Sequence, residues 1–244
     1  MTAIVIIPAR YDSTRFPGKP LSLLRGRPII QHVYENSRLS KLADDVIVAT
    51  DSETIFEKVL SFGGKAIMTN RAHPSGTDRV AEVATSVDFD IIVNMQADEP
   101  LIKPQMIDDV ITILEDRRAS IGTIIKKIED PREISDPNIV KVVFDKDWFA
   151  LYFSRTAIPY RAPHSSHLIN HFYKHIGLYS YRKEVLVELA GMDQTRLEQI
   201  EKLEQLRALE NGMKIKLKET FFETYGVDTP EDLERVEKCL STSL

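Results

Sequence analysis

The fold is decided by the opening stretch Ile4-Val5-Ile6-Ile7-Pro8-Ala9-Arg10-Tyr11-Asp12-Ser13-Thr14-Arg15-Phe16-Pro17-Gly18-Lys19-Pro20. It begins with β-branched apolar residues, which are typical of a buried strand. In an open α/β sheet, the loop after such a strand lies at the carboxyl edge, where ligands bind. Arg10, Arg15 and Lys19 would repel one another on this loop unless an anion lay among them, and a triphosphate supplies the opposite charge. The loop therefore predicts a phosphate clamp, and a solvated basic turn is the alternative.

Short apolar runs alternate with longer amphipathic stretches in the first half of the chain, at residues 4–7, 46–49, 66–68 and 91–95. This alternation predicts an α/β fold with a mixed, mostly parallel sheet and helices on both faces. Thr50 and Glu53 have capping-box spacing before one of these helices. From about Ile139 the runs 140–144 and 149–153 predict a small antiparallel part. Because no Gly/Ser-rich linker occurs, we expect one domain over residues 1–244.

Two acidic segments indicate a cation site. The apolar run 91–95 ends in Gln96-Ala97-Asp98-Glu99-Pro100, which places Asp98 at the same edge of the sheet as the cationic loop. Mg²⁺ usually takes only one or two protein carboxylates, so Asp98 is our first predicted ligand. Asp228 is the second, just before a helix with Thr229 as N-cap. Its alternative role is that of a capping carboxylate for that helix.

The second half of the chain holds a predicted helix over 197–210, with Thr195 and Glu198 at capping-box spacing. Glu201, Glu204 and Gln205 share one face of it, which suits a polyhydroxylated sugar, although a solvated polar face is the alternative. His175 could belong to a binding site, and the alternative is a core histidine whose ring nitrogens are hydrogen-bonded within the protein. We reject a zinc site with His171, because residues four apart in a strand lie about 13 Å apart. The stretch 158–171 predicts an exposed loop.

Composition narrows the class of protein. A formal net charge of -5 argues against a nucleic-acid partner, which would require clustered cations. The single Cys239 and the lack of a signal or membrane segment favour the cytoplasm, with no membrane partner. Neither a Walker loop nor a Gly-rich dinucleotide fingerprint is present, so standard kinases and dehydrogenases are disfavoured.

Together these segments resemble the CMP-Kdo synthetases, the 3-deoxy-manno-octulosonate (Kdo) cytidylyltransferases, from Ile4 to about Val236. Besides the opening loop and the Gln96–Pro100 turn, the resemblance rests on motifs in the family's order: Pro74-Ser75-Gly76-Thr77-Asp78-Arg79, Ala150-Leu151-Tyr152-Phe153-Ser154-Arg155, His175-Ile176-Gly177-Leu178-Tyr179, Leu203-Glu204-Gln205-Leu206-Arg207 and Gly226-Val227-Asp228-Thr229-Pro230-Glu231-Asp232-Leu233. It implies a Rossmann-like nucleotidyltransferase fold in a homodimer, with about 1–130 mainly binding nucleotide and about 131–220 mainly binding sugar and forming dimer contacts. The implied activity is CMP transfer from CTP to Kdo, giving CMP-Kdo and pyrophosphate for lipopolysaccharide biosynthesis.

The resemblance also implies roles for single residues. The catalytic group is Arg10, Arg15, Lys19, Asp98 and Asp228, of which Asp98 and Asp228 bind Mg²⁺. The CTP-binding residues are Pro8, Ala9, Arg10, Lys19, Ser75, Gly76, Arg79 and Gln96. The sugar-binding residues are Arg155, His175, Tyr179, Glu201, Glu204 and Gln205.

Ala97 departs from the family pattern, which normally has Gly between the Gln and Asp of this turn. If the position required a positive φ, Ala would carry about 1 kcal/mol of strain. The change could instead reflect another sugar, such as an amino-substituted Kdo. The open alternatives are therefore cytidylyl transfer to a different acid sugar or a polyol phosphate, a catalytically silent nucleotide-sugar binder, and, on fold alone, a dinucleotide-binding redox domain.

Overall fold

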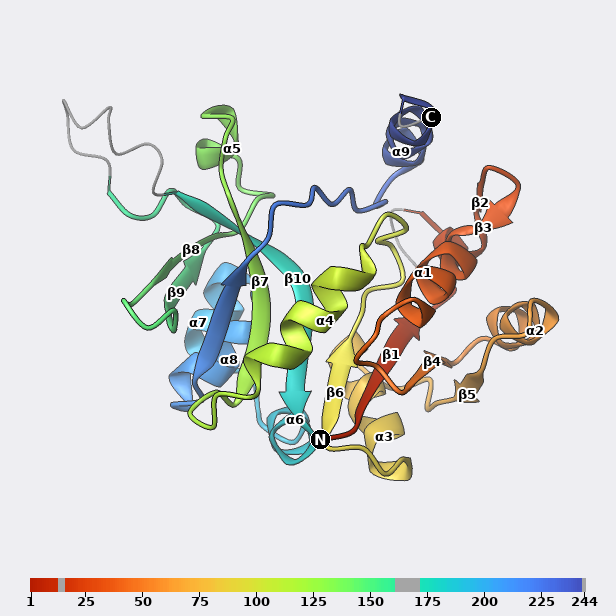
Figure 1. The fold of residues 1–244 in the computed structure, drawn as a ribbon, viewed down its shortest axis with the longest axis horizontal. Helices are drawn as coiled ribbons and strands as arrows, with labels where there is room; N and C mark the ends of the chain where they lie inside the picture. Colours follow the sequence, from red (N-terminus) through yellow and green to blue (C-terminus); the bar gives the residue numbers. More distant parts are fainter. Residues whose placement is uncertain (13–15, 161–171, 243–244) are drawn as a thin grey trace. The chain divides into compact units, whose positions relative to one another are not determined.

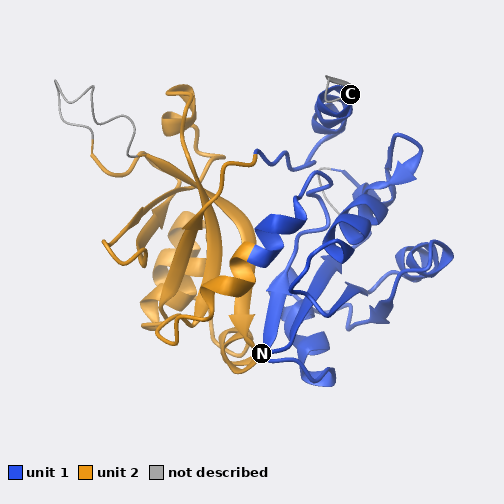
Figure 2. Ribbon diagram, in the orientation of Figure 1, with its two compact units in different colours: residues 1–108, 223–244 blue, residues 109–222 orange. Residues whose placement is uncertain are grey.

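The computed structural model describes residues 1–12, 16–160 and 172–242. Contacts within the chain divide it into two compact units, 1–108 with 223–244 and 109–222 (Figure 2). The C-terminal segment belongs to the same unit as the N-terminus.

The first unit contains a parallel sheet of four strands with short helices between them (Figure 1). Its elements are β1 (Ala3–Ala9), η1 (Lys19–Leu21), β2 (Leu23–Leu24), β3 (Arg27–Pro28), α1 (Ile29–Arg38), β4 (Asp45–Thr50), α2 (Glu53–Ser61), β5 (Ala66–Met68), α3 (Gly76–Ser86), β6 (Ile91–Asn94), the start of α4 (Pro104–Ile113) and α9 (Pro230–Thr242). All residues of β1 and β6 are buried, as their apolar runs predict.

The order of these strands creates a ligand-binding edge. β1 pairs with β4 on one side and with β6 on the other, both in parallel register. The chain thus moves from β1 outward to β4 and β5 and then returns to the opposite side of β1. At such a switch point the loops after adjacent strands diverge, and a crevice forms at the carboxyl ends. The cationic loop after β1 and the Gln96–Pro100 turn after β6 both lie at this edge.

The second unit is a mixed sheet with helices. Its elements are the end of α4, β7 (Ile121–Lys127), α5 (Arg132–Ser135), β8 (Lys141–Phe144), β9 (Ala150–Ser154), β10 (Tyr173–Arg182), α6 (Lys183–Ala190), α7 (Arg196–Glu201), α8 (Gln205–Glu210) and β11 (Ile215–Glu219). β7 is antiparallel to β10 and parallel to β11. β8 and β9 form the predicted antiparallel hairpin. The predicted α/β class, with a parallel and an antiparallel part, is confirmed.

Two local predictions are wrong. The helix expected over 197–210 is two helices, α7 and α8, because Lys202 adopts a left-handed backbone with φ 55°. The N-cap of α2 is Ser52, whose hydroxyl accepts from Ile55 N–H at 3.5 Å, and not Thr50. Thr50 is instead the buried last residue of β4, and its Oγ1 accepts from Ser52 N–H at 3.1 Å.

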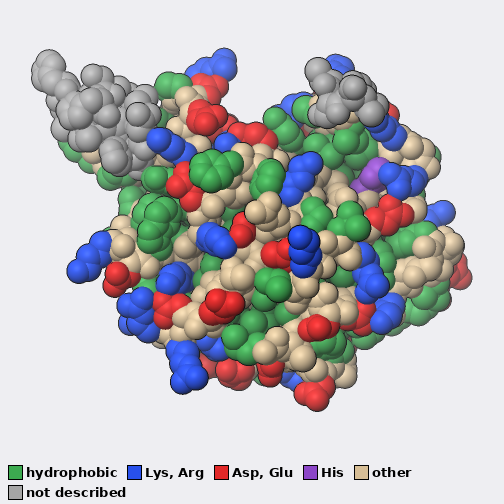
Figure 3. Space-filling model, viewed as in Figure 1, with side chains coloured by type: hydrophobic (Ala, Val, Ile, Leu, Met, Phe, Trp, Pro, Cys, Tyr) green, Lys and Arg blue, Asp and Glu red, His purple; other side chains and the backbone are tan. Residues whose placement is uncertain are grey.

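The surface carries charges of both signs. On the face drawn in Figure 3, Lys and Arg side chains are interspersed with Asp and Glu side chains. Among the described residues, no helix combines the length and apolar character that crossing a bilayer requires.

Candidate active site

A glycine and a short 3-10 helix place Lys19 at the carboxyl edge of the first unit. Gly18 has φ 70°, a left-handed conformation that glycine adopts without steric cost. Its N–H donates to Tyr11 O at 2.9 Å, which closes the loop after β1 on itself. Lys19 then begins η1 with its side chain turned into the protein.

The ammonium of Lys19 joins the two predicted metal carboxylates. Its Nζ lies 2.6 Å from Asp98 Oδ2 and 3.0 Å from Asp228 Oδ1. Burial opposes the charge on this amine, but the charges and hydrogen bonds of Asp98 and Asp228 outweigh burial and raise the pKa of Lys19 above its ordinary value. Residues 19, 98 and 228 thus meet at one point, although they are far apart in the sequence.

The structure also separates the two possible roles of Asp228. The carboxylate that caps α9 belongs to Asp232, whose Oδ2 accepts from the backbone N–H of Asp228 at 3.1 Å and of Thr229 at 3.0 Å. Asp232 N–H donates in turn to Thr229 Oγ1 at 3.2 Å, so Thr229 is the N-cap as predicted. The carboxylate of Asp228 is therefore not needed for capping and reaches Lys19.

Glu99, next to Asp98, has an unusual environment that sequence patterns did not indicate. Burial, together with the charges of Asp98 and Asp228, raises the pKa of its carboxyl to about 8. Its Oε2 is buried and has no hydrogen-bond partner among the residues that the structure describes. Burial is the largest cause of this pKa shift, and the nearby ammonium of Lys19 acts in the opposite direction.

A cavity of about 230 Å³ opens at this edge. It is lined by all eight residues predicted to bind CTP, from Pro8 and Ala9 to Gln96, and also by Pro20, His73, Ala97, Asp98 and Asp228. Residues from the ends of β1 and β6, the start of α3 and the segment before α9 therefore surround one space. Arg15, the remaining predicted catalytic residue, lies outside the described residues.

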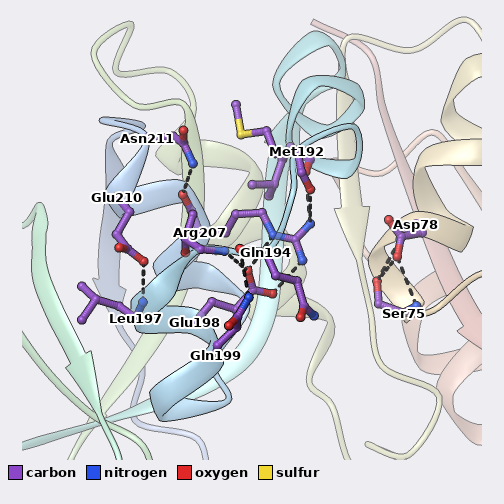
Figure 4. Close-up of polar contacts among 12 residues, drawn as sticks. Ser75, Asp78, Met192, Gln194, Leu197, Glu198, Gln199, Arg207, Glu210 and Asn211 are labelled. Atoms are coloured by element: carbon purple, nitrogen blue, oxygen red, sulfur yellow. Dashed lines mark hydrogen bonds and ion pairs between the residues drawn. The ribbon is translucent and has the colours of Figure 1, made fainter.

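The start of α3 forms one wall of the cavity. Ser75 is the N-cap: its hydroxyl accepts from Asp78 N–H at 3.1 Å and donates to Asp78 Oδ2 at 2.6 Å (Figure 4). A Cβ on Gly76 would lie 3.4 Å from Pro8 Cγ, so the helix start packs closely on the end of β1. The positive end of the α3 dipole, and the backbone N–H groups there, suit an anionic or acceptor-rich ligand.

Other lining residues are held by neighbours. Arg79 is buried, and its guanidinium donates to Asp51 Oδ2 at 2.8 Å and to Thr69 Oγ1. Gln96 Nε2 donates to Asn94 Oδ1 at 3.2 Å. Arg79 thus shapes the cavity while already ion-paired, whereas Arg10 is exposed at its mouth.

His73 is a cavity residue that sequence reasoning missed. Its Nε2 lies 2.5 Å from Glu82 Oε2, on the exposed side of α3. The N–H of Asn70 and the imidazole of His73 together hold the pKa of Glu82 below its ordinary value. In the sequence, only its position two residues before Ser75, a predicted CTP-binding residue, could have indicated that it lines this cavity.

Ala97 does not have the positive φ that would strain an alanine. Among the described residues, the non-glycine positions with positive φ are Arg25, Trp148 and Lys202. Ala97 is therefore outside the left-handed region, and its methyl group is buried in the turn with 8% exposure.

The six residues predicted to bind the sugar all lie in the second unit. Two of them, Arg155 and Glu201, are hydrogen-bonded to each other. Arg155 N–H donates to Glu201 Oε2 at 2.9 Å, and its Nε donates to Glu201 O at 2.8 Å. The same guanidinium reaches Lys202 O at 3.4 Å and Pro137 O at 3.0 Å. Arg155 thus satisfies carbonyls that the break between α7 and α8 leaves without helical partners.

The other four lie on β10 and at the start of α8. The rings of His175 and Tyr179 are 5.2 Å apart, and His175 Nε2 is 3.0 Å from Thr123 Oγ1. Burial lowers the pKa of His175 to about 3, so the ring is neutral at physiological pH. Burial and the charge of Glu204 raise the pKa of Tyr179 above its ordinary value. Gln205, the first residue of α8, is buried with 8% exposure.

The buried pair Glu198 and Arg207 holds α7 and α8 together (Figure 4). Arg207 donates from Nη2 to Glu198 Oε1 at 2.6 Å and from Nε to Glu198 Oε2 at 2.8 Å. Glu198 also accepts from the N–H of Thr195, the N-cap of α7, at 3.2 Å, as the capping spacing predicts. This ion pair therefore joins α7 and α8, the two helices that carry residues predicted to bind the sugar.

Comparison with known proteins identifies the family. Residues 4–215 match the family described as cytidylyltransferase. The 3-deoxy-manno-octulosonate cytidylyltransferase of Thermodesulfovibrio yellowstonii is 53% identical, with 99% of each chain covered. The enzyme of that name from Geobacter sulfurreducens is 49% identical, with 97% of this chain and 98% of the relative covered.

Solved structures that are similar to this chain support the same family. A CMP:2-keto-3-deoxy-manno-octonic acid synthetase complexed with CTP superposes with a TM-score of 0.94 at 41% identity, and each chain is covered completely. A cytidylyltransferase from Leptospira borgpetersenii shares the fold alone, with a TM-score of 0.67 at 19% identity over 100% of this chain and 88% of that one. The near-complete coverage at about half identity leads to one conclusion: this chain belongs to the 3-deoxy-manno-octulosonate cytidylyltransferase family.

Proposed function

We propose that this chain transfers CMP from CTP to Kdo, giving CMP-Kdo and pyrophosphate. The observation that carries the proposal is the meeting of Lys19, Asp98 and Asp228 at a cavity lined by every residue predicted to bind CTP. A structural relative at 41% identity is described as complexed with CTP, which supports the choice of nucleotide.

The reaction is a direct displacement. The anomeric 2-hydroxyl oxygen of Kdo attacks the α-phosphorus of CTP, and the new P–O bond forms as the bond to the pyrophosphate oxygen breaks. The hydroxyl proton leaves to solvent or to a substrate oxygen. Arg10 and Lys19 would offset the charge that gathers on the departing pyrophosphate, so the chain contributes positioning and electrostatic stabilisation.

The two carboxylates fit a magnesium ion. Mg²⁺ prefers hard oxygen donors and usually takes one or two carboxylates from the protein. Among the described residues no cluster of three or more His, Cys, Asp or Glu side chains has a metal-binding arrangement, so Asp98 and Asp228 would be the protein's share of the ligands. Bound there, the ion would act as a Lewis acid on phosphate oxygens and lower the pKa of the attacking hydroxyl. Lys19 would keep the two carboxylates together through the same contacts seen here.

The sugar acid would be recognised by the second unit. Glu201 and Glu204 offer acceptors for sugar hydroxyls, and His175 and Tyr179 offer a neutral polar surface. Arg155 is already engaged with backbone carbonyls, so we propose that it shapes this site by fixing the turn at Lys202. We further propose a homodimer in the cytoplasm that supplies CMP-Kdo to lipopolysaccharide biosynthesis.

Pyrophosphate release tests the proposal. The purified protein with Mg²⁺ is given CTP, UTP, ATP or GTP, each combined with Kdo, 8-amino-Kdo, N-acetylneuraminate or no acceptor. We expect release only with CTP and Kdo together. Release with CTP and another acceptor would retain cytidylyl transfer but overturn the named sugar, while CTP binding without release under any pairing would favour a silent binder. Size-exclusion chromatography with light scattering tests the dimer.

A further inference from the structure

The proposed reaction leaves the buried carboxyl of Glu99 without a task. Within residues 1–12, 16–160 and 172–242, its Oε2 is buried without a hydrogen-bond partner, and such an atom is costly to retain. Because such a group destabilises the folded protein, its place beside the reaction site needs a structural explanation.

The reason lies in what the other oxygen of Glu99 approaches. A Cβ built on Gly226 would lie 3.3 Å from Glu99 Oε1 and 3.9 Å from its Cδ. Gly226 has no positive φ, since the glycines in that region are Gly18, Gly26, Gly63 and Gly212. Backbone conformation therefore does not demand glycine at position 226. The carboxyl of Glu99 does restrict the space there, because a methyl group at position 226 would push it aside by a few tenths of an ångström.

The next residue makes a second contact with the same turn. Val227 N–H donates to Asp98 O at 2.9 Å, and the Val227 side chain is completely buried. One residue later, Asp228 Oδ1 meets Lys19 Nζ at 3.0 Å. The segment before α9 thus lies on the Asp98–Glu99 turn at consecutive positions, and the last of them carries the carboxylate that contacts Lys19.

We propose that Glu99 is a positioning residue: its carboxyl packs against Gly226 and holds the segment 226–228 on the turn that carries Asp98, so that Asp228 stays beside Lys19. The roles of Asp98, Asp228 and Lys19 in this statement rest on the proposed function. The packing of Glu99 on Gly226 does not, so the two can fail separately.

Hydrogen exchange at Val227 tests the packing directly, because this amide forms the bond to Asp98 O. We expect Glu99→Ala to speed its exchange about tenfold, since the segment loses its packing partner. Glu99→Gln keeps the shape and should stay within about twofold of the parent protein. The control Glu231→Ala removes an exposed carboxylate from the same end of the chain and should leave this exchange rate unchanged. Equal rates for Glu99→Ala and the parent protein would overturn the proposal.

A double-mutant cycle assigns the effect to this pair. Gly226→Ala alone should also speed Val227 exchange, because the new methyl group meets Glu99 Oε1. In the protein with both Glu99→Ala and Gly226→Ala, the methyl group occupies part of the vacated space, so the combined effect should be clearly smaller than the product of the single effects. Effects that simply multiply would show that the two residues act independently and would overturn the proposal.

Kinetics separates positioning from general stability. With CTP and the accepted sugar acid, Glu99→Ala should lower kcat about tenfold or more while the KM for the sugar acid stays within about twofold, and Glu99→Gln should restore most of kcat. If the protein transfers no CMP at all, the proposed function fails while the exchange results still decide the packing. If transfer occurs but Glu99→Ala leaves kcat unchanged, the positioning role fails and the function stands.

Discussion

Lys19 Nζ and Asp98 Oδ2 lie 2.6 Å apart, with only 13% of the lysine side chain exposed. This ion pair connects the loop after β1 to the turn after β6, across two adjacent parallel strands. Because Asp228 joins it from the C-terminal segment, one ammonium bridges two carboxylates and offsets part of the repulsion between them.

Lys19→Met should therefore affect turnover more than nucleotide binding. We expect kcat at saturating CTP to fall by about 10²-fold or more, comparable to the loss of one preorganised donor to a developing anion. Steady-state pyrophosphate release measures the change, with the exposed Lys58→Met as a matched control. Near-normal turnover in Lys19→Met would remove this residue from the catalytic group.

The buried pair of Glu198 and Arg207 yields a stability prediction. Their side chains are 7% and 8% exposed, so Arg207→Met would leave Glu198 charged in a dry environment. We expect a loss of about 3–5 kcal/mol in the free energy of unfolding, measured by urea denaturation. The exposed pair of Arg27 and Glu35 provides the control, since Arg27→Met should cost less than about 1 kcal/mol. Equal losses at the two sites would contradict the argument from burial.

Features set by neighbouring residues were predictable from the sequence. The capping pairs Thr195–Glu198 and Thr229–Asp232 form within a single turn, so side-chain chemistry and spacing decide them. The parallel strands and the cavity edge followed from the β-branched runs and from the rule that ligands bind at strand ends. Thr50 misled because the same residue also completes a buried strand, which left the cap to Ser52.

Features set by distant residues were not predictable. The apolar period of 197–210 continues through Lys202, so periodicity could not show the break. The break is stabilised by Arg155, the residue after β9, which donates to the carbonyls of residues 201 and 202. The carboxyl of Glu99 likewise lies against Gly226, and no local pattern connects the two residues. Packing between remote segments decides such positions.

His175 should make stability depend on pH. Burial lowers the pKa of His175 from its ordinary 6.5 to about 3, so the folded protein favours the neutral ring. The stabilisation is complete above pH 6.5 and is lost as the pH falls toward 3, because the unfolded chain binds the proton first. At pH 5 the free energy of unfolding should be lower by about 2 kcal/mol than at pH 7.5 because of this residue. Urea denaturation at both pH values should show a smaller difference for His175→Gln than for the parent protein, and identical differences would contradict the shifted pKa.

Arg155 tests whether the turn at Lys202 serves the sugar acid. Its guanidinium spans three carbonyls, of Pro137, Glu201 and Lys202, and a lysine ammonium is a compact point charge that cannot reproduce this planar fork. Arg155→Lys should therefore loosen the turn and misplace Glu201, which raises the KM for Kdo about tenfold while the KM for CTP changes less than about twofold. The control Arg196→Lys alters an exposed arginine at the start of α7 and should leave both constants unchanged. A parallel rise in both KM values would show that the turn supports the whole protein and not the sugar site.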